Sequence, residues 1–238
     1  MYAGVLNRIA GIRQDREGAR SIETELREAI CEVGRRLHAK NLIAATDGNI
    51  SIRLSEDRFL CTPSGVPKGT LQPDDLLIAD AHGKKISGDG RVSTEIFTHL
   101  AAYEERNDIS AVVHAHPPKA VALTLARISM EDEILPEVVY ALGAVPTAPY
   151  ATPGTLEGAE AIRDLIRRND ALLLDRHGAL TVGPDVFTAY GAMERLEHAA
   201  GIIFDASLLG DLRKLSDDEL RRLHQARQDH DSASYSDT

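Results

Sequence analysis

Cysteine is scarce in this chain of 238 residues, occurring only as Cys31 and Cys61. The two residues form no C-x-x-C pair, and two isolated cysteines provide no disulfide framework. Both lie among apolar neighbours in the sequence, which favours small buried side chains. The scarcity of cysteine fits a reducing compartment, and we expect the protein to be cytoplasmic.

Long apolar runs and an excess of positive charge are also missing. No stretch approaches the roughly 18 apolar residues that a membrane span needs, and residues 1–13 lack the apolar core and cleavage site of a secretory signal. The net charge of −10 provides no positive field for non-specific binding to nucleic acid or to an anionic membrane surface. An anionic small molecule is still an acceptable ligand, because a bound metal ion can make one pocket positive on an acidic protein.

The rest of the composition is ordinary for a soluble globular protein, with 43% hydrophobic residues. The length suits one sizeable α/β domain better than two small ones. We expect an N-terminal extension over residues 1–16, a single domain over residues 17–227 and a disordered polar tail over residues 228–238.

Hydrophobic periodicity changes several times along the chain, which predicts alternating helices and strands. Apolar residues at spacings of three and four predict helices over residues 17–40, 93–106, 119–127, 155–168, 187–209 and 217–227. Shorter apolar runs predict strands over residues 49–54, 58–62, 76–80, 111–116, 145–150 and 171–175. Because the first two strands form a predicted hairpin and helices separate the later ones, we expect a mixed sheet with helices on both faces.

Three of the nine histidines stand at predicted strand ends. His114 and His116 lie two apart, so both side chains point to one face of their strand. His177 follows a second apolar strand and precedes a glycine. Two imidazoles on one face can hold a metal ion, but H-x-H is a weak motif that also describes two hydrogen-bonded strand histidines. The sequence does not say whether the two strands are adjacent.

Glu95 stands at the start of the predicted helix 93–106. A carboxylate in a first helical turn interacts favourably with the helix dipole, and this explanation needs no catalysis. Alternatively, Glu95 and His99 are four residues apart on one helix face and could share a metal ion.

Three turns are rich in glycine or hydroxyl groups, namely Thr46-Asp-Gly-Asn49, Thr62-Pro-Ser-Gly65 and Ser93-Thr94. Exposed backbone N–H groups beside hydroxyls or an amide can hold a phosphate, especially at a helix start. Taken singly, each such segment is more often an ordinary turn.

In their order along the chain, these motifs resemble the class II aldolase and adducin family, in particular its fuculose-phosphate type of aldolase. The resemblance covers residues 26–209. It rests on six motifs: Thr46-Asp-Gly-Asn49, Thr62-Pro-Ser-Gly65, Ser93-Thr-Glu95, Ala111-Val-Val-His-Ala-His116, Ala148-Pro-Tyr-Ala-Thr-Pro-Gly-Thr155 and His177-Gly178. One such motif is weak evidence, whereas six in the same order are strong evidence for the family.

The resemblance implies a three-layer α/β/α fold with a mixed, mainly antiparallel central sheet, and a homotetramer with active sites near subunit interfaces. It also implies a zinc ion on His114, His116 and His177, with Glu95 as a displaceable fourth ligand and as the catalytic acid and base. The implied substrate is a sugar phosphate, whose phosphate group would be held by Gly48, Asn49, Ser64, Gly65, Ser93 and Thr94.

The implied reaction is zinc-dependent aldol cleavage of a ketose 1-phosphate to dihydroxyacetone phosphate and an aldehyde. Zinc can stabilise the resulting enediolate as a Lewis acid while a carboxylate carries the proton. Aldolases of this type use a tyrosine from a neighbouring subunit. In this chain the corresponding position falls near Leu135, and Tyr140 is out of register.

Other members of the family leave alternatives open. They include decarboxylases of sugar-acid phosphates, dehydratases of thiosugar phosphates and non-catalytic adducin-like binding modules. Epimerases that resemble this family lack a glutamate at the position of Glu95, which makes epimerisation a weaker expectation here. The intact zinc and phosphate motifs argue against a binding module.

Overall fold

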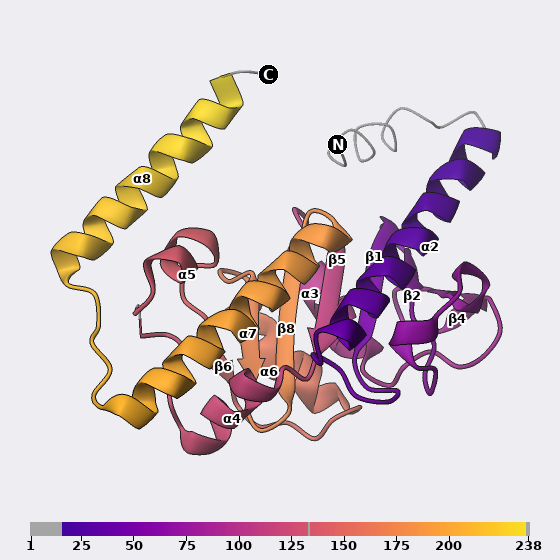
Figure 1. Cartoon of the computed structure of the whole chain (residues 1–238). Coiled ribbons are helices and arrows are strands. Elements are labelled where there is room, and N and C mark those ends of the chain that lie inside the picture. The colour runs from indigo at the N-terminus through magenta and orange to yellow at the C-terminus, as the bar shows by residue number, and fades with distance from the viewer. Residues whose placement is uncertain (1–15, 133, 237–238) are drawn as a thin grey trace.

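The computed structural model describes residues 16–132 and 134–236. One sheet runs through this part of the chain, with strands in the order β4-β3-β2-β1-β5-β8-β7-β6 (Figure 1). The pairing of β6 with β7 is parallel and the other strand pairs are antiparallel, so the predicted mixed, mainly antiparallel sheet is confirmed. The strands are β1 (Asn49–Ser55), β2 (Arg58–Cys61), β3 (Leu77–Ala79), β4 (Lys85–Ser87), β5 (Ala111–Ala115), β6 (Thr147–Ala148), β7 (Ala171–Leu174) and β8 (Gly178–Gly183).

Helices cover both faces of the sheet, which confirms the predicted three layers. On one face, apolar side chains of the strands pack against α2 (Arg16–Ala39), α4 (Pro118–Ala126) and α7 (Val186–Leu209). On the other face they pack against α3 (Ile96–Glu105) and α6 (Leu156–Ile166). Figure 1 shows α2 and α7 crossing in front of the sheet.

Strand register determines which polar side chains meet. In the pairing of β1 with β5, Asn49 lies opposite His114 and Ser51 lies opposite Val112. These four residues share the face that carries α3, because side chains alternate along a strand and the intervening Val113 packs on the α7 side. The sheet therefore brings polar side chains that are distant in sequence to one side.

Several predicted boundaries were wrong. The predicted helix 93–106 begins at Ile96, because Ser93 accepts a bond from the Glu95 N–H in the preceding turn. β8 was not predicted, although it is central to the sheet, because glycines interrupt its short apolar pattern at both ends.

The C-terminal region also differs from expectation. Helix α8 (Asp217–Ser236) continues through most of the predicted disordered tail, residues 228–238, and it contains no glycine or proline that would end it. A bond from Gln225 Nε2 to Asp229 Oδ1, at 2.8 Å, links successive turns across the predicted boundary. Most of the predicted N-terminal extension, 1–16, lies outside the described residues. No helix within 16–132 or 134–236 is both long and apolar enough to cross a membrane.

Candidate metal-binding site

Three histidines converge at one edge of the sheet. His114 is in β5, His116 follows two residues later, and His177 lies in the turn between β7 and β8. One ring nitrogen from each lies within 4.8 Å of the others, and the ring centroids are 4.8–5.0 Å apart. The antiparallel pairing of β5 and β8 produces this convergence, because the end of β5 lies beside the start of β8.

The hydrogen bonding of His114 orients its free nitrogen toward the other two rings. His114 Nδ1 is 2.9 Å from the carbonyl oxygen of Ala179, which can only accept, so Nδ1 carries the proton. His114 Nε2 therefore presents a lone pair, 3.1 Å from Nε2 of His116. Burial lowers the pKa of His114 to about 4 and also lowers that of His116, which favours the neutral imidazoles that bind metal ions.

Gly178 permits the close approach of the two strand ends. A side-chain carbon at this position would lie 2.4 Å from the carbonyl oxygen of Ala115 and 2.9–3.0 Å from the rings of His116 and His114. Only glycine fits there without movement of the backbone. The His-Gly step therefore has a geometric reason, since the glycine lets His177 turn in beside the histidine pair.

Glu95 completes the group from the loop before α3. Its Oε1 lies 3.3 Å from His177 Nε2 and 3.6 Å from His114 Nε2, and its Oε2 accepts a 2.7 Å hydrogen bond from Asn49 Nδ2. Burial alone would raise the pKa of Glu95, but its interactions with His177, His114 and Asn49 outweigh burial and lower it overall. The carboxylate is therefore ionised and held against the histidine cluster.

His99 is near these groups but belongs to a different network. Its Nδ1 is 2.7 Å from the hydroxyl of Ser51, which is 2.9 Å from the hydroxyl of Tyr103. The ligand atoms that cluster for a metal ion come from the three strand-end histidines and not from His99. The alternative in which Glu95 and His99 alone share a metal ion is therefore not supported.

The donor set fits a divalent transition metal. Three imidazoles with one displaceable carboxylate are the ligands that zinc takes in catalytic sites, where a further position stays open for substrate. The same donors also suit other divalent metals of the first transition row. The geometry of the three histidines suits an ion of this chemical class, and zinc itself is a proposal.

The predicted phosphate-binding residues lie on three neighbouring loops. The N–H of Ser64 bonds to the carbonyl oxygen of Arg91 at 2.8 Å, so the turn containing Ser64 and Gly65 runs beside the segment leading to Ser93 and Thr94. On the third loop, Gly48 has φ of +70°, and a side chain on it would strike the carbonyl oxygen of His114. Two of the loops border the histidine cluster, through the contact of Gly48 with β5 and the bond from the Glu95 N–H to Ser93 Oγ, and the Ser64 turn adjoins the second of them.

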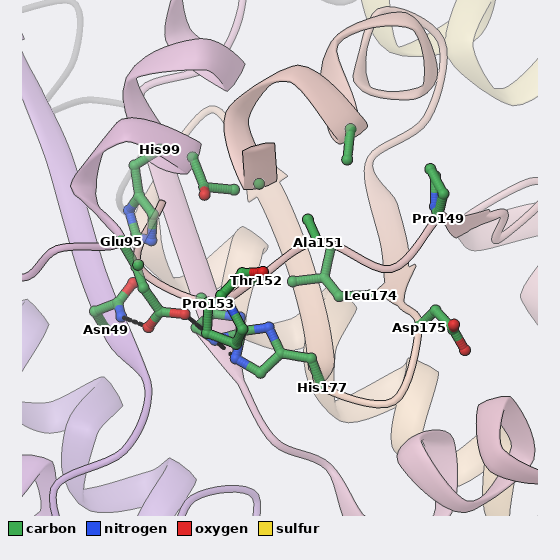
Figure 2. Close-up of a pocket in the computed structure, with 15 residues that line it drawn as sticks. Asn49, Glu95, His99, Pro149, Ala151, Thr152, Pro153, Leu174, Asp175 and His177 are labelled. Atoms are coloured by element: carbon green, nitrogen blue, oxygen red, sulfur yellow. Dashed lines mark hydrogen bonds and ion pairs between the residues drawn. The ribbon is translucent and has the colours of Figure 1, made fainter. Parts of the chain in front are cut away.

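A cavity beside Glu95 is lined in part by one segment that sequence patterns had not assigned to the site (Figure 2). Its walls include Asn49, Glu95, His99, His114 and His177 together with Pro149, Ala151, Thr152, Pro153 and Gly154. The A-P-Y-A-x-x-G-T motif contains the last five of these residues, so its resemblance could have placed it there. Two charged residues near the site, Asp47 and Lys68, were also missed.

The fold is a three-layer α/β fold, and its histidine cluster could hold a metal ion. A family model described as "Class II Aldolase and Adducin N-terminal domain" matches residues 28–204. The chain belongs to this family, as its motifs predicted.

Several proteins similar to this chain are named as decarboxylases or aldolases of phosphorylated sugars or sugar acids. The chain is 33% identical over 208 residues to a 3-oxo-tetronate 4-phosphate decarboxylase of Escherichia coli, covering 85% of this chain and 96% of that one. It is 33% identical over 202 residues to a 5-deoxy-D-ribulose 1-phosphate aldolase of Bacillus thuringiensis, covering 83% and 92%. A solved L-fuculose 1-phosphate aldolase superposes with a TM-score of 0.79 at 27% identity, covering 86% of this chain and 96% of that one.

Proposed function

We propose that this protein is a metal-dependent lyase that decarboxylates a 3-oxo sugar-acid phosphate. The observation that carries the proposal is the convergence of His114, His116 and His177 with the Glu95 carboxylate beside one cavity. The sequence alone favoured aldol cleavage of a ketose 1-phosphate, with decarboxylation as an alternative. The similarity to several decarboxylases of 3-oxo-tetronate 4-phosphate shifts the preference to that alternative.

The reactions named for the two kinds of relative share one intermediate. A 3-oxo-tetronate 4-phosphate that loses its carboxyl group as carbon dioxide leaves the enediolate of dihydroxyacetone phosphate. Cleavage of 5-deoxyribulose 1-phosphate between C3 and C4 leaves the same enediolate and releases acetaldehyde. A site that stabilises negative charge on the two oxygens of this fragment, and holds its phosphate, therefore suits either reaction.

The residues divide this work between them. The three histidines would hold the divalent cation, which when bound acts as a Lewis acid toward negative charge developing on oxygen. Glu95 is ionised and lies against the cluster, so it can take up a proton from solvent and deliver it to the enediolate carbon that has lost carbon dioxide. Asn49 fixes the other carboxylate oxygen and so sets the direction of that transfer.

Decarboxylation makes a smaller demand on the protein than aldol cleavage. Aldol cleavage needs a base for the hydroxyl proton of the departing aldehyde, whereas the carboxylate of a 3-oxo acid leaves without a proton. The position that corresponds to the tyrosine of the fuculose-phosphate type falls near Leu135, which packs against the apolar core, and Tyr140 lies five residues later on α5 (Pro136–Ala141). This supports decarboxylation and leaves aldol cleavage as the second candidate.

Product analysis of the metal-loaded protein tests the assignment. Incubation with 3-oxo-tetronate 4-phosphate should yield equal amounts of carbon dioxide and dihydroxyacetone phosphate. Incubation with 5-deoxyribulose 1-phosphate should yield little dihydroxyacetone phosphate or acetaldehyde. The opposite preference would replace the decarboxylase with the aldolase, and turnover of neither compound, nor of a thiosugar phosphate, would favour an adducin-like binding module.

Three further properties are part of the proposal. The metal would be zinc, because three neutral imidazoles with an open position suit it. The protein would act in the cytoplasm as a homotetramer, as the family resemblance implies. Sedimentation and metal analysis of the purified protein measure the assembly and the bound metal directly.

A further inference from the structure

Lys68 is a buried lysine near the site that the proposed reaction does not use. Its side chain is among the largest fully buried ones in the described chain, with 2% of the residue exposed. The ammonium nitrogen donates to the carbonyl oxygens of Thr46, at 2.6 Å, and Val66, at 3.0 Å. These carbonyls belong to or adjoin two of the three loops that carry the predicted phosphate-binding residues.

Close packing fixes the backbone of Lys68. The residue begins a short 3-10 turn, η1 (Lys68–Thr70), that lies against α2. A side-chain carbon on Gly34 of α2 would lie 2.4 Å from the carbonyl oxygen of Lys68, and one on Gly69 would lie within 2.9 Å of the His38 side chain. The two glycines let the helix and the turn approach closely, so the backbone of Lys68 is held firmly while its side chain extends into the interior.

The charge of Lys68 has no carboxylate partner within ion-pair distance among the residues that the structure describes. Burial lowers the pKa of Lys68, while Asp47 and Glu95 act against this shift from farther away. A buried cation normally has a neighbouring anion, because removal from water is costly unless the charge is compensated. The two carbonyl dipoles compensate Lys68 only in part, so the site favours an additional anion.

The position of Lys68 identifies where such an anion would bind. Its ammonium group donates to the Thr46 carbonyl oxygen, in the loop before Asn49, and to the carbonyl oxygen of Val66, which directly follows Gly65. The second of these loops is joined to the Ser93 segment by the bond from Ser64 N–H to the Arg91 carbonyl oxygen. One buried positive charge therefore lies behind a cradle formed by three loops.

We propose that Lys68 is a positioning residue for the substrate's phosphate group, joining two loops of the cradle and providing the buried positive charge that favours a dianion. This inference rests on the proposed function, because it assumes that the three loops bind phosphate. Lys68 contacts the loops from behind and is not a catalytic residue. Its contribution is to substrate binding, so it acts on KM and leaves the chemical step unchanged.

Inorganic phosphate is the probe that tests Lys68 without relying on turnover. Its affinity for the metal-loaded protein is measured by calorimetry in wild type, in Lys68→Met, which keeps the length of the side chain, and in Lys40→Met. Lys40 is a control for the loss of one positive charge, because it pairs with Glu194 at the protein surface. We expect phosphate affinity to fall roughly 10- to 100-fold in Lys68→Met, as for the loss of a poorly screened charge, and to be unchanged in Lys40→Met.

Kinetics provide the readout that a purely structural role would not give. In Lys68→Met the KM for the phosphorylated substrate should rise by a similar factor with kcat and bound metal retained. Wild-type affinity for phosphate in Lys68→Met overturns the inference, whereas a wild-type protein that binds no phosphate refutes the phosphate cradle itself. If Lys68→Met does not fold, Lys68→Gln, which keeps an amide donor, is measured in the same way. Failure of both variants to fold would show that the ammonium group serves folding and would also overturn the inference.

Discussion

The two faces of the central sheet have different chemistry, although the same strands build both. On β1 and β5 the residues facing α2 and α7 are apolar, as in Ile50, Ile52 and Val113. Their neighbours facing α3 include Asn49 and His114, which are buried and polar. Both faces stabilise the fold through burial of apolar area, but the α3 face also holds polar groups that are costly to bury unless they are hydrogen-bonded.

This difference predicts that substitutions on the two faces separate activity from stability. Changes among the buried polar groups on the α3 face should abolish or slow turnover while the protein stays folded. Changes on the α7 face should lower the free energy of unfolding while the folded fraction keeps its activity.

Replacing His177 with alanine should have the largest effect. The variant would lose one of the three proposed metal ligands, and with it charge stabilisation in the transition state, so we expect loss of bound metal and at least about a 10³-fold fall in kcat/KM. Metal analysis and steady-state kinetics measure both. His82→Ala is the control, because His82 is exposed in a turn and does not belong to the histidine cluster. Full metal content and activity in His177→Ala would exclude His177 from the site.

Glu95→Gln tests the acid and base role. Glutamine keeps the shape and the bond from Asn49 but cannot accept a proton, so kcat should fall roughly 10²- to 10⁴-fold. The three histidines should retain the metal ion. If Glu95 merely favoured the start of α3 through the helix dipole, the change would alter stability by about 0.3–1 kcal/mol and leave kcat nearly intact. Loss of the metal would instead make Glu95 an obligatory ligand.

Leu196→Ala should have the opposite profile. Leu196 is fully buried in α7 on the apolar face. Removing its side chain should lower the free energy of unfolding by about 2–5 kcal/mol, from lost burial and a residual cavity. Denaturant unfolding measures this loss, and kcat per folded molecule should match wild type. A large loss of kcat in the folded variant would contradict the separation of the two faces.

Gly178→Ala and Gly191→Ala form a matched pair. At Gly178 the added carbon would collide with β5 beside two metal ligands, so we expect about 1–3 kcal/mol of destabilisation and weaker metal binding. At Gly191, within α7, nothing lies within 4 Å, and alanine should stabilise the helix by roughly 0.5–1 kcal/mol. Equal effects at both positions would show that close approach at Gly178 is unimportant.

The pH dependence of stability should reflect the buried histidines of the polar face. Burial lowers the pKa of His114 to about 4 and that of His99 to about 3, from an ordinary value of 6.5. Below pH 6.5 the unfolded state binds more protons than the folded state, so the metal-free protein should lose stability as pH falls toward 4. Each group contributes at most about 1.4 kcal/mol per pH unit. Unfolding of the protein freed of metal by a chelator, measured at several pH values, gives the slope of the free energy of unfolding against pH. A shallower slope in His99→Gln would show that His99 contributes to it.

The sequence predicted the family, the layered fold and the residues worth testing, because each of these predictions rests on motifs or periodicity within short segments. The hairpin of β1 and β2 and the long helices α2 and α7 follow from periodicity over adjacent residues. The convergence of His177 with His114 could not be derived in this way, because it depends on the pairing of β5 with β8, and β8 was missed. Family resemblance supplied the connection that periodicity lacked.

Burial explains why sequence reasoning missed Lys68. Lys68 follows a turn and looks like a solvated surface lysine, yet the small size of Gly34 lets its segment pack against α2. The predicted helix boundary at residue 227 also differs, since α8 continues to Ser236.

The most direct test of the account is a crystal structure of the metal-loaded protein with the metal located by anomalous scattering. We expect one divalent ion bound by His114, His116 and His177, with nitrogen–metal distances of roughly 2.0–2.1 Å if the ion is zinc. His99 should remain bonded to Ser51 and outside the first coordination shell. An ion bound elsewhere, or a site that leaves out His177, would contradict the metal centre and the lyase function proposed from it.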